Sequence, residues 1–141
     1  MANKAKEIIE ECEKKYKTHK AFCNEFVIEV AKKFGVTLSG DADEIVKGLK
    51  KDGWTLIKDG KTAKEKADNG WFVVAGLRSD KHDPPRKSGH VAIVVKGELA
   101  HDKYPTGWWG SEDNVKGDGL TLNYSWNKKD RDNIVYAGKE I

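Results

Sequence analysis

The chain has 141 residues, a formal net charge of +3 at pH 7 and 35% charged residues. A chain of this length is expected to form one domain, residues 1–141, that buries about two thirds of the surface its unfolded form exposes. Lysines alternate with acidic residues nearly everywhere, as on a solvated surface, so we expect no nucleic-acid partner. The longest apolar runs, 71–75 and 91–95, are too short to span a bilayer, and the N-terminal residues show no signal peptide. We therefore expect no membrane insertion, and a protein that depends on another route if it acts outside its own cell.

The first half of the chain has helical periodicity. Apolar residues recur at helical spacing over about 4–17 and again over 22–34, where Gly35 is a plausible stop. An acidic start predicts a third helix over 41–53. A capping box that begins at Thr62 predicts a short fourth helix, ending near residue 70.

The second half has the period of strands. Strands before and after a loop at 78–88, followed by a turn and a returning strand, predict an antiparallel meander. Helices first and strands second imply an α+β fold, with the helices packed on an antiparallel sheet. The expected strands are 71–77, 91–95, 99–104 after a turn at 96–98, 120–126, and 134–137.

Two cysteines and one histidine stand out. Cys12 falls on the inner stripe of the first helix, as a small buried apolar residue would. Cys23 instead opens the second helix, where the partial positive charge of the helix end favours a thiolate. His90 opens an apolar strand after Ser88-Gly89 and could accept the thiol proton. The two residues are candidates for a nucleophile and its base. Each could also be a packing residue, and a Cys12–Cys23 disulfide would disable the nucleophile.

The order of these segments resembles a known family. A cysteine on a helix, then Ala67-Asp68-Asn69-Gly70-Trp71-Phe72-Val73-Val74, then Gly89-His90-Val91-Ala92 is similar to the papain-like peptidoglycan hydrolases of the NlpC and CHAP type. The segment 104–111, with the short chain that shows no signal peptide, most resembles the small amidase effectors of type VI secretion systems. The resemblance covers about residues 15–126.

The resemblance assigns roles to particular residues. It implies that Cys23 is the nucleophile, that His90 is the base, and that the main-chain N–H of Cys23 helps to hold the oxyanion. Family members have a third polar residue on the strand after the histidine. Asp102 is expected in that position. Three rivals of Asp102 remain, because a register error of one residue turns every side chain to the other face. Separately, two weak candidates could complete the oxyanion hole. The rivals are His101, Ser111 and Asn123, and the oxyanion candidates are Tyr16 and Thr18.

Aromatic and charged residues near the expected site allow further predictions. Trp108 and Trp109 lie between two glycines and could line a substrate groove, although packing is an equal alternative. The loop 81–87 could gate that groove, contact carboxylates of the wall, or be only a solvated connection. Histidine and aspartate are present without metal-binding spacing, so we expect no metal and no other cofactor.

The resemblance also implies a biological role. It suggests a cysteine amidase or endopeptidase that cuts an amide bond in the peptide stem of peptidoglycan, is delivered into a rival's periplasm, and is blocked by a cognate immunity protein. We expect a monomer. Two alternatives stay open at this stage: a phage or housekeeping lysin with the same chemistry, and a non-catalytic domain that binds the wall or a protein.

Overall fold

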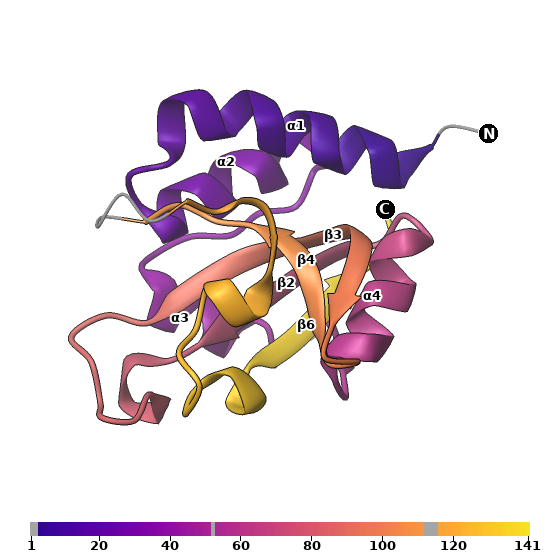
Figure 1. The fold of residues 1–141 in the computed structure, drawn as a ribbon. Helices are drawn as coiled ribbons and strands as arrows, with labels where there is room; N and C mark the ends of the chain where they lie inside the picture. The colour runs from indigo at the N-terminus through magenta and orange to yellow at the C-terminus, as the bar shows by residue number, and fades with distance from the viewer. Residues whose placement is uncertain (1–2, 52, 112–115) are drawn as a thin grey trace.

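The computed structural model describes residues 3–51, 53–111 and 116–141. Six strands form one sheet in the order β1-β6-β2-β3-β4-β5, and every neighbouring pair is antiparallel. Helices pack on both faces of this sheet (Figure 1), so the predicted α+β class is confirmed. The elements are α1 (Lys4–His19), α2 (Cys23–Lys33), α3 (Ala42–Gly48), β1 (Thr55–Ile57), α4 (Gly60–Asp68), β2 (Phe72–Leu77), η1 (Ser79–Lys81), β3 (His90–Ala100), β4 (Tyr104–Trp108), β5 (Asp118–Thr121), η2 (Leu122–Tyr124), η3 (Arg131–Asn133) and β6 (Val135–Lys139).

The two faces of the sheet bury two separate apolar clusters. Alternation along β2 sends Phe72 and Val74 to one face, beneath α1, α2 and α3. It sends Val73 and Ala75 to the other, where they pack with α4 and with Trp126 from the chain after η2. Because both faces are covered, all six residues of β2 are buried, and the strand reads as a continuous apolar run.

β3 is longer than the sequence predicted, and this changes the course of the chain. The expected turn at 96–98 is wrong, because the strand continues to Ala100 through an irregularity in its pairing with β4. Gly97 is not a turn residue there: a Cβ on it would lie 2.6 Å from Thr106 Oγ1, so glycine permits the close approach of β4. The real turn is His101-Asp102, where both residues have positive φ, of 53° and 58°.

Three smaller differences concern the ends of elements. The predicted strand 120–126 ends early, because β5 stops at Thr121 and the chain winds into η2. The helix α4 is capped by Asp59 rather than Thr62, whose N–H donates to the Asp59 carboxylate at 2.8 Å. The strand β1 was not predicted. Within the described part of the chain, no helix is long and apolar enough to cross a membrane.

Candidate active site

Cys23 is the first residue of α2 and is half-buried. The helix begins there because Phe22 has an extended backbone, with φ −134° and ψ 129°. Phe22, the N-cap residue, makes no side-chain hydrogen bond to the N–H groups of the first turn. The start of α2 is fixed from a distant segment, since the N–H of Ser111 donates to Lys20 O at 2.7 Å. The thiol therefore lies at the positive end of a helix dipole.

His90 is the first residue of β3, opposite Leu77 of β2. The residue before it must be small: a Cβ on Gly89 would lie 2.3 Å from Asp43 Oδ1 and 2.9 Å from Leu77 O. The imidazole is held on two sides. Its Nε2 lies 2.6 Å from Ser125 Oγ, and its ring packs against Trp126 with centroids 4.8 Å apart at 67°. These contacts fix the ring in one orientation.

The surroundings keep the imidazole neutral. Burial, followed by the positive charges of Arg86 and His82, lowers the pKa of His90 from 6.5 to about 3. A neutral imidazole has one ring nitrogen free to accept a proton. His90 can therefore accept a proton at neutral pH, and its lowered pKa makes it a weaker base than an ordinary histidine.

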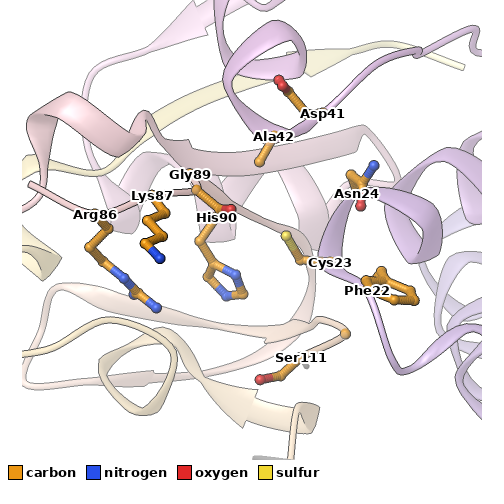
Figure 2. A pocket seen from close by; sticks show the side chains of 12 residues that line it. Phe22, Cys23, Asn24, Asp41, Ala42, Arg86, Lys87, Gly89, His90 and Ser111 are labelled. Carbon is orange, nitrogen blue, oxygen red and sulfur yellow. The ribbon is translucent and has the colours of Figure 1, made fainter. Parts of the chain in front are cut away.

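Cys23 and His90 line the same cavity, of about 450 Å³, although they come from opposite halves of the sequence. Figure 2 shows both side chains directed into it from α2 and β3. Phe22 and Asn24 lie on the Cys23 side, and Arg86 and Lys87 lie beyond His90. The remaining lining residues are Asp41, Ala42, Ser88, Gly89, Gly110 and Ser111.

The prediction that Asp102 orients His90 is corrected by the structure. His90 is the first residue of β3, and Asp102 lies in the turn beyond the last residue of the same strand. An extended strand of this length separates the two residues by roughly 30 Å. Its side chain is 80% exposed and forms an ion pair with Lys61. Its rival His101 shares that turn and is exposed. The cause is the misplaced turn, which put the returning strand next to the histidine.

The two tryptophans predicted to bind substrate do not line the cavity. Trp109 is 1% exposed and belongs to the core beneath the sheet, so it cannot meet a substrate. Trp108 is half-buried, and the edge of its ring packs against Tyr16 at 5.5 Å between centroids. Both follow the packing alternative.

The other candidates divide in the same way. Ser111 lines the cavity, whereas Asn123 lies in η2 and does not. Tyr16 accepts a hydrogen bond from the N–H of Gly117 at 3.1 Å, and Thr18 is exposed on α1, so neither reaches the cavity. Of the groups expected to hold the oxyanion, only the backbone at the start of α2 lies at the cavity.

Ser125 is the residue that sequence reasoning missed. It follows η2, in a segment predicted as a strand, and it contacts His90 from 35 positions away. Its neighbour Trp126 is 3% exposed and belongs to the core. The adjacency of a hydroxyl to a core tryptophan is the only local signal the sequence offered.

Neither Cys12 nor Cys23 takes part in a disulfide, so the alternative Cys12–Cys23 bridge is not formed. Cys12 is fully buried, and burial, followed by the charges of Glu11 and Glu13, raises the pKa of its thiol well above its usual value. Among the described residues no group of three or more histidine, cysteine, aspartate or glutamate side chains could hold a metal ion.

A cysteine at a helix N-terminus and a histidine at the start of a core strand, meeting at one cavity of an α+β fold, define the papain-like class of cysteine hydrolases. No family model matches the chain. The chain is 39% identical over 118 residues to "Peptidoglycan amidase Tse1" of Pseudomonas aeruginosa. The match covers 81% of this chain and 72% of that protein. The chain belongs to the family of this amidase.

Proposed function

We propose that this protein is a peptidoglycan amidase, which hydrolyses an amide bond in the peptide stem or crosslink through Cys23 and His90. The observation that carries the proposal is the meeting of these two side chains at one cavity in a relative of Tse1. The relative's name supports the substrate class, and the position of Cys23 and His90 at one cavity supports their roles as nucleophile and base.

The chemistry follows from the contacts of His90. When Nε2 carries the proton and donates a hydrogen bond to Ser125 Oγ, Nδ1 is the unprotonated, basic nitrogen of the ring. Cys23 Sγ attacks the amide carbonyl and its proton passes to His90, forming a tetrahedral oxyanion next to the N–H groups that open α2. The C–N bond breaks as His90 returns the proton to the leaving amine, which leaves a thioester on Cys23. Water, deprotonated by His90, then attacks the thioester, releases a carboxylic acid and restores the thiol.

Ser125 acts as a positioning residue in this scheme. Its hydroxyl oxygen accepts a hydrogen bond from Nε2–H, which holds the tautomer and stabilises the imidazolium that forms in each half-reaction. A serine provides no full negative charge, so the support is weaker than that from a buried carboxylate.

The test is digestion of purified Gram-negative sacculi with wild type and with Cys23→Ala, with products resolved by chromatography and mass spectrometry. New muropeptides released only by the wild type would support the amidase, and their masses would identify the bond. Cys12→Ala is the matched control, because it removes the other thiol without touching the cavity. Release by neither protein would contradict the proposal and favour a binding domain.

The proposal extends to an antibacterial role, in which a monomeric effector is delivered to the periplasm of a target cell and a cognate immunity protein blocks the cavity. Expression of the chain in a test bacterium separates the two compartments. Lysis is expected when the chain is directed to the periplasm and not when it is retained in the cytoplasm, and Cys23→Ala should abolish lysis. Lysis by the Cys23→Ala variant would contradict this role.

A further inference from the structure

Two positive side chains at the cavity are not used by the proposed mechanism. Arg86 and Lys87 line it beyond His90, on the side away from Cys23 (Figure 2). Arg86 is close enough that its charge lowers the pKa of His90. No ion pair joins either side chain to another described residue, although nearby Arg78 is paired with Asp80 at 3.0 Å. Two positive charges at the rim of a cavity attract an anion.

The loop that carries these residues is built into the fold at several points. The N–H of Arg86 donates to Ser79 O at 3.0 Å, and the N–H of Ser79 donates to Asp43 Oδ1 at 2.7 Å. Further along, His82 is 3% exposed and its Nδ1 lies 2.9 Å from Arg78 O. The N–H of Asp83 donates to the buried carboxylate of Asp130 at 2.7 Å. The backbone of Arg86 is therefore held by the fold, and its exposed side chain extends from this fixed point to the cavity.

The side of the cavity determines which part of the substrate Arg86 meets. His90 protonates the leaving nitrogen, so the fragment that leaves as the amine must lie over His90. The acyl fragment lies over Cys23 and the start of α2. Groups beyond His90, seen from Cys23, therefore contact the amine fragment (Figure 2).

The carboxylate in the cavity lining caps a helix and lies away from the two cations. Asp41 also lines the cavity, but its Oδ1 accepts the N–H of Glu44 at 2.9 Å within the capping box of α3. It lies apart from Arg86 and Lys87 in Figure 2. The part of the cavity beyond His90 thus offers an anion two cations and no described carboxylate.

We propose that Arg86, assisted by Lys87, binds a free carboxylate on the fragment that leaves as the amine, and so selects substrates whose released amine carries that carboxylate. The inference rests on the proposed amide hydrolysis and names its leaving side. A guanidinium can bind both carboxylate oxygens at once, whereas the ammonium of Lys87 acts as a single point charge, so Arg86 contributes the larger share.

The experiment compares two synthetic stem peptides that contain the amide identified by sacculus digestion and differ at one group, a free carboxylate or a carboxamide on the amine fragment. Wild type is expected to cleave the free acid with a kcat/KM about 10- to 100-fold higher, in line with a charge-assisted pair. At a pH well above the acid limb, where the loss of the Arg86 charge leaves His90 neutral, Arg86→Gln should lose that preference by slowing only on the free acid, and Arg86→Lys should keep part of it. Arg78→Gln is the matched control, since it removes one positive charge from the same segment and Arg78 lines a different cavity.

The outcomes separate this inference from the function on which it rests. An equal loss on both peptides in Arg86→Gln, or no preference in wild type, would overturn the carboxylate subsite while leaving the amidase in place. Cleavage of neither peptide by wild type, with sacculi also intact, would overturn the proposed function itself. Thermal unfolding of Arg86→Gln at the wild-type temperature would show that the loss of preference does not come from misfolding.

Discussion

The two ends of β3 carry similar residues in opposite circumstances. At its start, His90 is half-buried, packed on Trp126, bonded to Ser125 and directed into a cavity with Cys23. Beyond its end, His101 and Asp102 form an exposed turn with positive φ, and Asp102 forms an ion pair with Lys61. A histidine beside an aspartate looks more like catalytic machinery than a histidine beside a glycine. The comparison shows that burial and a fixed partner, rather than residue type, make an imidazole useful for catalysis.

The two histidines give the largest expected difference. His90→Gln should lower kcat/KM on sacculi or stem peptides by about 10³-fold or more, because both proton transfers lose their carrier. His101→Gln should stay within about twofold of wild type, as expected for an exposed residue far from the reaction. Steady-state kinetics on one substrate compares both variants. A large loss in His101→Gln would break the comparison.

The residues next to the two histidines, Ser125 beside His90 and Asp102 beside His101, test the same comparison. Ser125→Ala should reduce kcat by about 10- to 100-fold with little change in KM, because a hydrogen bond to a charged group contributes about 1.5–3 kcal/mol and this one reaches an imidazolium only during the reaction. Asp102→Asn should have no measurable effect, since its surface ion pair is exposed.

Rescue distinguishes orientation of the ring from general packing. Ser125→Thr keeps the hydroxyl and should recover most of the kcat lost in Ser125→Ala. A Ser125→Ala variant as active as wild type would remove Ser125 from the mechanism, and a loss in Asp102→Asn would restore the residue that the structure excludes.

The pH profile gives a smaller but distinctive effect. The pKa of His90 lies well below its ordinary value, so His90 stays neutral as the pH falls through 6.5, and the acid limb of kcat/KM should lie below pH 6.5. Arg86→Gln removes one of the positive charges that depress this pKa, and should move the limb upward. A wild-type limb above pH 6.5 would show that His90 is not held neutral in the free enzyme.

The sequence predicted the parts of the site that depend on local patterns. Cys23 was found because an apolar helical stripe begins at it, and His90 because a glycine precedes an apolar strand. The α+β class followed from the change of period along the chain. Asp102 and the strand 99–104 failed together, because Lys96-Gly97-Glu98 has the composition of a turn while Gly97 serves the approach of Thr106. Ser125 could not be predicted, since its contact depends on how η2 folds back over the sheet.

The tryptophan pair illustrates a second limit. Glycines on either side of Trp108-Trp109 suggested an exposed rim, but β4 lies next to the edge of a covered sheet, and Trp109, the residue after it, packs in the core. Sequence alone does not show that η2 and the following residues cover that face.

The coupling of Cys23 to His90 is tested most directly by site-resolved alkylation. Iodoacetamide labelling of wild type, His90→Gln and His101→Gln, followed by peptide mass spectrometry, gives a separate rate for each cysteine. We expect Cys23 to react far faster than the buried Cys12 in wild type. Its rate should fall at least about tenfold in His90→Gln and stay unchanged in His101→Gln, since a base that takes up the thiol proton accelerates the attack of the sulfur. Equal Cys23 rates in wild type and His90→Gln would contradict the catalytic pair on which the whole account depends.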